Sequence, residues 1–282
     1  MKTRIIIDST ADIRSDLRDC FMIVPLTINF GDEEYIDGVT IDHKTFYEKL
    51  IESDVMPTTS QATPDSFIKV YDEVVNSGDN AVVITVASKL SGTYQSAVIA
   101  SEDYADRIFV IDSKSVAIGT GILAEMALTM ADNDIPASVI AKRIMDEREN
   151  VCLIAMLDTL EYLKRGGRIS KTVAFAGGLL SIKPVVCIDD GEIKILGKAR
   201  GSRQGNNLLV QQIQSAGGVD FSKPVLLGYT GLSDILLQKY IEDSAYLWES
   251  HVSDLNISAI GSVVGTHAGP GAIAAAFFKK QN

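Results

Sequence analysis

The chain has 282 residues, 46% of them hydrophobic, and a formal net charge of −11. This length favours two domains, and the acidic balance argues against nucleic acid as a partner, because phosphate contacts need a basic surface. No apolar run approaches the ~18 residues of a membrane span, and the first apolar run is too short for a signal peptide. We therefore expect a cytoplasmic protein with no integral membrane segment.

The first half of the chain alternates apolar strands with helical segments. Strands are predicted at 4–7, 22–26, 81–86 and 108–111, and helices at 64–75, 91–104, 118–130 and 136–149. Pro25 indicates that the second strand lies at an edge of its sheet or ends there. Such alternation is typical of a parallel sheet with helices on both faces, so we expect an α/β domain over residues 1–150.

The second half has a different pattern. It contains a strong hairpin signal, two runs at 182–188 and 193–198 separated by the turn sequence Asp-Asp-Gly-Glu. The other predicted elements are strands at 151–156, 225–229 and 257–264, helices at 160–164, 204–215 and 233–250, and a final helix opened by Gly269-Pro270-Gly271. Hairpins mixed with helices predict a smaller α+β domain over residues 151–282, with the boundary near Asn150.

Cysteine and histidine give no sign of a metal or cofactor. The cysteines are odd in number and widely spaced, and we expect buried free thiols at Cys20, Cys152 and Cys187. The histidines lie on unrelated segments, which argues against a metal site. They are His43, His251 and His267.

Four polar motifs each follow an apolar run. They are Thr-Thr-Ser-Gln at 58–61, Leu-Ser-Gly-Thr-Tyr at 90–94, Gly-Gly-Arg-Ile-Ser at 166–170 and Thr-His-Ala-Gly-Pro-Gly at 266–271. Hydroxyls, one arginine, one histidine and glycines that allow close approach are suited to holding an anionic head group. No acid–base pair or metal cluster accompanies them, so the pattern favours a protein that holds a ligand over one that transforms it.

The two hydroxyl-rich motifs precede predicted helices. Ser91-Gly92-Thr93 follows the strand 81–86 and opens a helix, so its hydroxyls and free amides form either an anion site or an ordinary N-cap. A glycine at position 92 would let a ligand or a neighbouring backbone come close. The run 58–61 lies ahead of a helix that starts near Pro64, and its three hydroxyls are more than one cap needs.

The charged residues of the other motifs allow two interpretations each. Arg168, in a glycine loop, could pair with a carboxylate or phosphate, or with an aspartate of the first domain. His267, just before a glycine turn, is either structural or a head-group donor. The carboxylates of Asp8 and Asp112 close two strands at the same sheet edge, and we expect them to cap turns rather than to act as acid and base.

Positive charge is concentrated in the segment 164–203. This segment holds nine Lys or Arg and only three acids, on a protein that is acidic overall. It is either a docking surface for an anionic ligand or an acidic partner, or a set of solvated charges.

Together these motifs resemble the DegV family of bacterial fatty-acid-binding proteins, which include the binding subunits of fatty acid kinases. The resemblance runs from Ile7-Asp8-Ser9 to 266–271, and its most specific stretches are 90–97 and 160–170. Ile182-Lys183-Pro184 and 267–271 add to them. It implies a Rossmann-like first domain and a smaller second domain, with a lipid enclosed between or beneath them.

The resemblance also implies site residues and a function. The fatty-acid carboxylate would be held by Thr59 and Ser91, with His267 and Arg168 completing or bordering the site, and no cofactor other than the bound fatty acid. Secondary candidates in the same motifs are Ser60, Gly92 and Thr93. The expected protein is a carrier that presents a long-chain fatty acid to a separate fatty acid kinase for phosphorylation to an acyl phosphate. The alternative is a hydrolase or transferase that uses Ser91, although the G-x-S-x-G, P-loop and G-x-G-x-x-G patterns are absent.

Overall fold

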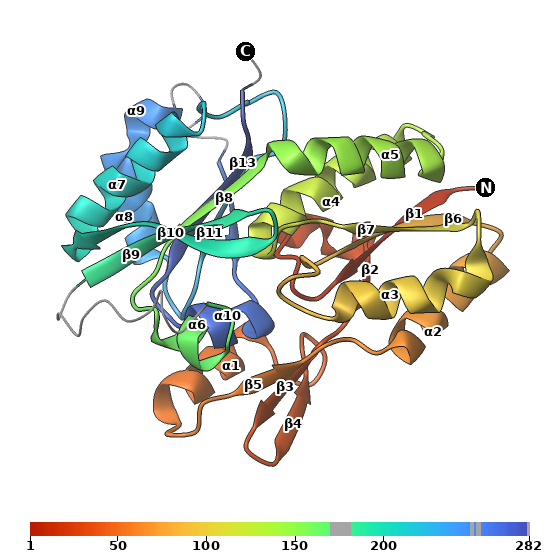
Figure 1. The fold of residues 1–282 in the computed structure, drawn as a ribbon, viewed down its shortest axis with the longest axis horizontal. Helices are drawn as coiled ribbons and strands as arrows, with labels where there is room; N and C mark the ends of the chain where they lie inside the picture. Colours follow the sequence, from red (N-terminus) through yellow and green to blue (C-terminus); the bar gives the residue numbers. More distant parts are fainter. Residues whose placement is uncertain (170–181, 249–250, 252–254, 281–282) are drawn as a thin grey trace.

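The computed structural model describes residues 1–169, 182–248, 251 and 255–280. These residues form a parallel sheet, a larger mixed sheet and a small antiparallel sheet (Figure 1). The expected α/β class, with a parallel sheet in the first half and a hairpin-containing mixed sheet in the second, is confirmed. No helix among the residues in these ranges is long and apolar enough to cross a membrane.

The parallel sheet has four strands in the order β2-β1-β6-β7, and every neighbouring pair is parallel. The strands are β1 Thr3–Asp8, β2 Met22–Val24, β6 Asn80–Thr85 and β7 Ile108–Asp112. Strand β2 lies at the edge and Pro25 follows its last residue, as the sequence predicts, because proline cannot continue the ladder.

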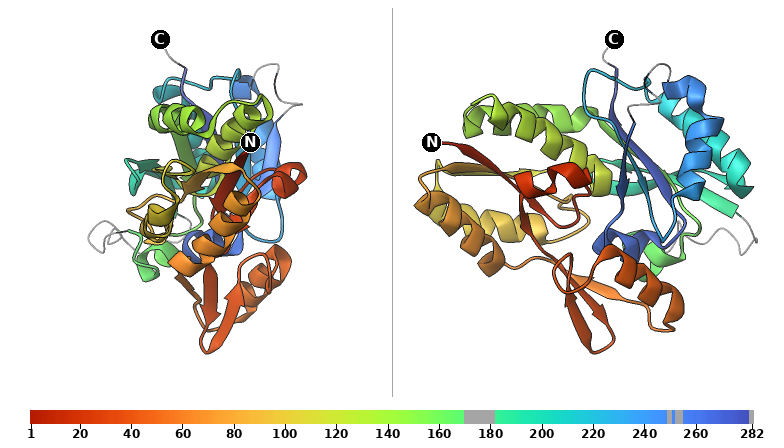
Figure 2. Two further views of the ribbon diagram at one scale, coloured as in Figure 1. Left: turned by 90° about the vertical axis from the view of Figure 1, so that its right-hand side faces the viewer. Right: turned by 180° about the vertical axis from the view of Figure 1, so that it is seen from behind.

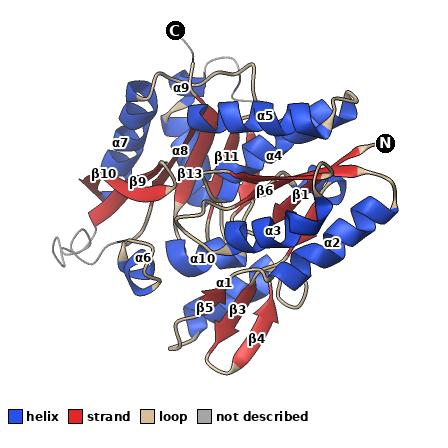
Figure 3. Ribbon diagram, turned by 45° about the vertical axis from the view of Figure 1, so that its right-hand side comes forward, coloured by secondary structure: helices blue, strands red, loops and turns tan. Residues whose placement is uncertain are grey.

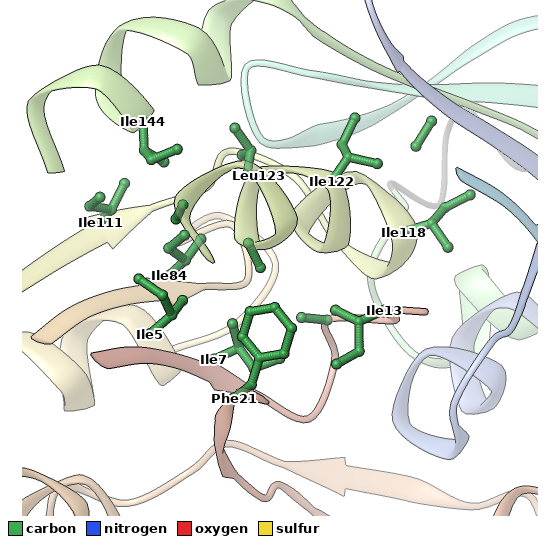
Figure 4. Packing of buried hydrophobic residues seen from close by; sticks show 14 of the residues in the cluster. Ile5, Ile7, Ile13, Phe21, Ile84, Ile111, Ile118, Ile122, Leu123 and Ile144 are labelled. Atoms are coloured by element: carbon green, nitrogen blue, oxygen red, sulfur yellow. The ribbon is translucent and has the colours of Figure 1, made fainter. Parts of the chain in front are cut away.

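Helices cover both faces of this sheet. On one face lie α2 Pro64–Asn76 and α3 Thr93–Ser101, and on the other lie α4 Ala117–Asp132 and α5 Ala137–Glu147. Alternate residues of β1 point to opposite faces, so Ile5 and Ile7 pack with α4 and α5 whereas Ile6 packs on the other side. Figure 4 shows Ile118, Ile122 and Leu123 of α4 above the isoleucines of the strands. The short 3₁₀ segments are η1 Ser15–Cys20, η2 Glu102–Tyr104 and η3 Arg148–Asn150.

The mixed sheet has six strands in the order β10-β9-β8-β13-β11-β12, of which only β11 and β12 are parallel to each other. Its strands are β8 Val151–Met156, β9 Ile182–Asp189, β10 Glu192–Arg200, β11 Leu226–Tyr229, β12 Asn256–Ala259 and β13 Ile273–Phe278. One face packs on α7 Gly201–Ser215, α8 Ile235–Asp243 and α9 Ala245–Trp248. The other face packs on α4, so this helix is shared by both large sheets (Figure 3).

The third sheet was not expected from the sequence. It is antiparallel, with the order β4-β3-β5, and it lies at one end of the molecule beside α1 (Figure 2). Its elements are β3 Thr27–Phe30, β4 Glu33–Ile36 and β5 Thr58–Ser60, with α1 His43–Glu52 between β4 and β5. The Thr-Thr-Ser motif, expected in a loop before a helix, is therefore an edge strand.

The end of the chain corrects two predictions. The strand expected at 257–264 ends at Ala259, and residues Ser262–Ala268 form helix α10 instead. The final helix expected after Gly269-Pro270-Gly271 is strand β13, which lies inside the mixed sheet between β8 and β11. In addition, the helix expected at 91–104 begins at Thr93, and the helix expected at 233–250 is divided into α8 and α9.

The cysteine prediction was partly wrong. All three thiols are free, but Cys20 is exposed and the thiols of Cys152 and Cys187 are only half-buried. Burial raises the pKa of the Cys152 thiol to about 11, so this group stays protonated near neutral pH.

Candidate functional site

A mostly apolar cavity lies between the C-terminal edge of the parallel sheet and one face of the mixed sheet. About 940 Å³ in and around it is not filled by protein atoms, and part of that space opens to solvent. Aliphatic side chains from several elements form its walls, including Val116, Leu153, Leu157, Val186, Ile193 and Val263. A cavity with such walls suits an apolar ligand.

The four principal site residues of the sequence analysis all line this cavity. They are Thr59 of β5, Ser91 ahead of α3, Arg168 after α6 Glu161–Arg165, and His267 in α10. Thr59 and His267 are 208 residues apart, yet Thr59 Oγ1 lies 2.9 Å from His267 Nε2. The fold thus places at least one residue of each of the four motifs at the cavity wall.

The sequence places His267 just ahead of a final helix, but in the structure it lies in the last turn of α10. Glycine makes room for it: a Cβ on Gly166 would lie 2.1 Å from His267 Nδ1. Gly269, which follows the helix with a φ of +71°, is equally constrained, since a Cβ there would lie 2.3 Å from the ring of Tyr162. These glycines of the two motifs therefore serve side-chain packing around the histidine.

The imidazole of His267 is neutral at physiological pH. Burial, together with the positive charge of Arg168, lowers its pKa to about 4. Nδ1 is buried without a hydrogen-bond partner among the described residues. If Nε2 carries the proton, it donates to Thr59 Oγ1, and the threonine hydroxyl is then free to donate its own proton into the cavity.

Arg168 joins two loops of the site. Its Nε donates to the carbonyl of Leu90 at 3.2 Å, and its Nη1 donates to the carbonyl of Gly166 at 2.7 Å. Among the described residues no carboxylate lies within ion-pair distance of the guanidinium, so the predicted alternative of an aspartate from the first domain is not observed. The cavity wall thus carries a positive charge that the described side chains do not neutralise.

Ser91 has partners within its own motif. Its Oγ lies 2.9 Å from Thr93 Oγ1 and accepts a hydrogen bond from the Thr93 amide at 3.2 Å, so it also caps the start of α3. A serine nucleophile needs a base within hydrogen-bond reach. The pocket histidine, His267, is bonded to Thr59 instead, which gives the Ser91-dependent hydrolase no support.

The secondary candidates do not line the cavity. Ser60 is exposed, and Thr93 is fully buried behind Ser91. The close approach predicted at Gly92 is real, but the neighbour is a side chain rather than a ligand: a Cβ there would lie 2.1 Å from Gln61 Oε1. Gln61 in turn donates to Ser96 at 3.0 Å, which ties the first hydroxyl motif to α3.

The carboxylates at the sheet edge act as the sequence predicts. Asp8 accepts hydrogen bonds from the amide and hydroxyl of Thr10 and from the amide of Val86. Asp112 accepts from Ser88 and from the amide of Lys114. Both orient turns, and the described residues contain no group of three His, Cys, Asp or Glu side chains placed to hold a metal ion.

Several positive charges of the basic segment 164–203 are neutralised by ion pairs. Three of its cations pair with acids: Arg165 with Glu161, Lys183 with Asp158 and Lys194 with Asp189. Arg200 and Arg203, around the start of α7, are exposed and have no ion-pair partner within the described ranges. Ser170 and Lys171 lie outside the described residues.

Sequence reasoning missed the apolar half of the site. Val186 and Ile188 of β9 and Ile193 of β10 line the cavity, with the polar residues Thr10 and Thr230 beside them. The period-2 alternation of the hairpin is the signal that could have assigned one face of it to the cavity. Nothing in the local sequence shows what that face encloses.

The whole chain is similar to known proteins. A family model described as "Uncharacterised protein, DegV family" matches residues 2–280. A DegV domain-containing protein of Caldanaerobacter subterraneus is 37% identical over 285 residues, which cover 99% of both proteins. Another, from Clostridium perfringens, is 32% identical over 95% of each.

Solved structures share the fold over the full length. A DegV family protein from Thermus thermophilus, described by its fatty acid binding, has a TM-score of 0.88 and 27% identity, covering 99% of this chain and 100% of that one. A DegV lipid binding protein from Thermotoga maritima has a TM-score of 0.85 and 26% identity over all of both chains. The Streptococcus pneumoniae Fatty Acid Kinase (Fak) B3 protein, loaded with linoleic acid, has a TM-score of 0.87 and 24% identity, covering 99% of this chain and 100% of that one. The family model and the full-length relatives together show that the chain belongs to the DegV family.

Proposed function

We propose that this protein is a carrier that binds one long-chain fatty acid in the cavity and presents its carboxylate to a separate kinase. The observation that carries the proposal is the combination of aliphatic walls with one arginine, Arg168, that has no carboxylate partner among the described residues. An amphiphile with an anionic head complements both features.

The apolar walls would supply the affinity. Burying a tail of about fifteen methylenes is worth on the order of 10 kcal/mol before the costs of association, at ~0.8 kcal/mol per methylene. The aliphatic side chains that line the cavity include residues of the mixed sheet, of α10 and of the loops that follow strands of the parallel sheet, so they offer such a tail an apolar surrounding. The solved relatives from Thermus thermophilus and Thermotoga maritima, described as binding fatty acid and lipid, support this part of the proposal.

The polar residues would orient the ligand. A buried carboxylate must be hydrogen-bonded, or its burial costs several kcal/mol. The hydroxyls of Thr59 and Ser91 can donate to its oxygens, and Arg168 has donors left after its bonds to two carbonyls. His267, being neutral, would act mainly by holding Thr59 in the orientation that donates to the ligand.

The proposal also includes a partner kinase. A carrier leaves phosphorylation of the carboxylate to another protein, which must dock close to the head group. Our candidate docking face is the basic segment 164–203, with Arg200 and Arg203 among its exposed cations. The Fak B3 protein, named for a fatty acid kinase, has the same fold. We propose that this protein docks to such a kinase. We also propose that it is cytoplasmic and that its two domains meet near Asn150.

Native mass spectrometry of protein purified without added ligand tests the binding function. We expect a bound species whose mass, after denaturation and extraction, is that of a fatty acid. The matched control is the Arg168→Met variant purified in parallel, which should carry less of it. A wild-type protein that is empty, or that carries a nucleotide, contradicts the carrier.

A further inference from the structure

The helix that carries His267 is held at its start by residues from the beginning of the chain. The amide of Gly261, just before α10, donates to Asp12 Oδ1 at 2.7 Å. Three residues before Gly261, in strand β12, the hydroxyl of Ser258 donates to the carbonyl of Ile13 at 2.9 Å. These contacts join segments 245 or more residues apart, so the placement of α10 depends on the loop that follows β1.

That loop is itself fixed. A Cβ on Gly121 of α4 would lie 2.0 Å from the carbonyl oxygen of Asp12, so the backbone of α4 packs directly on the loop. On the other side, Thr10 is bonded to the buried carboxylate of Asp8 and lines the cavity. The loop 10–13 is therefore a rigid support between the cavity wall and α10.

The middle of α10 is packed as closely. A Cβ on Gly265 would lie 2.4 Å from the hydroxyl of Tyr47 and 2.9 Å from the ring of Phe46, so α10 lies directly on α1. The same Tyr47 hydroxyl donates to the carbonyl of Ile260 at 3.1 Å. With both its start and its middle held, the position of the last turn is determined.

Burying the carboxyl of Asp12 is unfavourable in free energy, more so than burying the hydroxyl that usually caps a helix. It is 6% exposed, and its Oδ2 is buried without a partner among the described residues. Burial raises its pKa, as do the nearby carboxylates of Asp37 and Asp8, whereas the Gly261 amide and Arg18 act in the opposite direction. Serine or threonine caps a helix without this cost, which indicates that the aspartate has a specific role.

We propose that Asp12 is a positioning residue for the head-group site, which fixes the start of α10 against the loop 10–13 and so holds His267 within hydrogen-bond distance of Thr59. Helix α10 has seven residues and a length of about 10 Å, so it moves as one piece. A displacement of about 1 Å at its start would break the 2.9 Å contact between His267 and Thr59. The effect on ligand affinity rests on the proposed function, whereas the effect on His267 does not.

The experiment follows the His267 imidazole by NMR while ligand affinity is measured on the same samples. Asp12→Ala removes the acceptor, and Asp12→Asn keeps an oxygen at the Oδ1 position. Tyr47→Phe removes the hydrogen bond to Ile260. Its matched control is Tyr71→Phe, which removes a similar buried bond between two other helices, from the Tyr71 hydroxyl in α2 to the carbonyl of Ala97 in α3 at 3.2 Å.

In wild type the imidazole should titrate near its lowered pKa of about 4. In Asp12→Ala we expect this pKa to move toward the ordinary value of about 6.5, and fatty-acid affinity to fall about tenfold, the loss typical of one misplaced hydrogen-bonding group. Asp12→Asn should restore both quantities, and Tyr47→Phe should move both in the same direction by less. Tyr71→Phe should change neither.

The inference is overturned if folded Asp12→Ala titrates as wild type does, or if Asp12→Asn fails to restore the titration. Should Asp12→Ala not fold, an unshifted imidazole in Tyr47→Phe overturns it equally. A shifted imidazole pKa with unchanged fatty-acid affinity supports the positioning role of Asp12 and contradicts the proposed role of His267 in binding.

Discussion

Replacing Arg168 with methionine removes the guanidinium but keeps an unbranched apolar side chain at the cavity wall. A carboxylate about 4 Å from this charge gains up to about 4 kcal/mol at an effective dielectric constant of about 20. Charge-assisted hydrogen bonds are typically worth about 1.5–3 kcal/mol. Taken together, we expect Arg168→Met to weaken fatty-acid binding by about 2–4 kcal/mol, or roughly 30- to 1,000-fold in Kd.

The variant also loses two bonds inside the protein, from the guanidinium to the carbonyls of Leu90 and Gly166. This loss should lower the free energy of unfolding by about 1–3 kcal/mol. Because both carbonyls belong to loops of the site, affinity and stability must be measured separately, and thermal denaturation of the ligand-free protein gives the second quantity.

The assay compares a saturated C16 acid with the alcohol of the same length, by displacement of a fluorescent fatty acid. Only the acid carries the charge that Arg168 is proposed to bind, so the variant should bind the acid far more weakly and the alcohol almost as well as wild type does. Arg203→Met, at an exposed position, is the control for the loss of one positive charge. Equal losses for the acid and the alcohol would refute the ion-pair reasoning and assign Arg168 a packing role.

Ser91→Ala should weaken fatty-acid binding by roughly 1–3 kcal/mol with the fold intact, because a buried carboxylate loses one donor; an unchanged Kd in the same displacement assay would leave Ser91 as a helix cap only. Since the pKa of His267 is lowered to about 4 in the folded protein, its contribution to stability is present above the unfolded value of about 6.5 and is lost as the pH falls from about 6.5 to 4. Thermal denaturation should therefore show less loss of stability over this interval in His267→Gln than in wild type, and parallel curves would contradict the neutral imidazole. Charge reversal at Arg200 or Arg203 should slow phosphorylation of bound fatty acid by the partner kinase at low salt while the fatty-acid Kd stays near wild type, since exposed charges act mainly on encounter. A loss of lipid binding in these variants, or an unchanged kinase rate at low salt, would argue against the docking face.

The parallel sheet was predictable because its strands are short β-branched runs buried on both faces. The run at 81–86 reads as such a strand, and the structure has β6 at Asn80–Thr85. The turn sequence around Asp190 likewise fixed the hairpin of β9 and β10. Strong local signals and the observed elements agree in both places.

The end of the chain could not be predicted, because tertiary contacts override local preference there. Strand β13 contains Ala274-Ala275-Ala276, and alanine is the best helix former. It is nevertheless a strand, and its residues 273–276, which include the three alanines, pair with β8 on one side and β11 on the other. The valines of α10 favour a strand, yet this segment is helical, with its start held by Asp12 and Gly265 packed on α1.

The site divides in the same way. The polar motifs and the family resemblance that they carry pointed to Thr59, Ser91, Arg168 and His267, and all four line one cavity. The resemblance implied that these residues meet at one site. The direct contact between Thr59 and His267 was not predicted, because it requires β5 of a sheet that local patterns did not reveal. The walls of the cavity come from five or more elements, so only the folded chain defines them.

In the proposed complex, the carboxylate of the fatty acid lies at the end of the cavity that holds Thr59, Ser91 and Arg168. The most direct measurement is a crystal structure of delipidated protein reloaded with a saturated C16 fatty acid. We expect carboxylate oxygens about 2.7–3.2 Å from the hydroxyls of Thr59 and Ser91 and the guanidinium of Arg168, with the tail between the two large sheets. A carboxylate at the opposite end, or a ligand bound outside this cavity, would contradict the proposal.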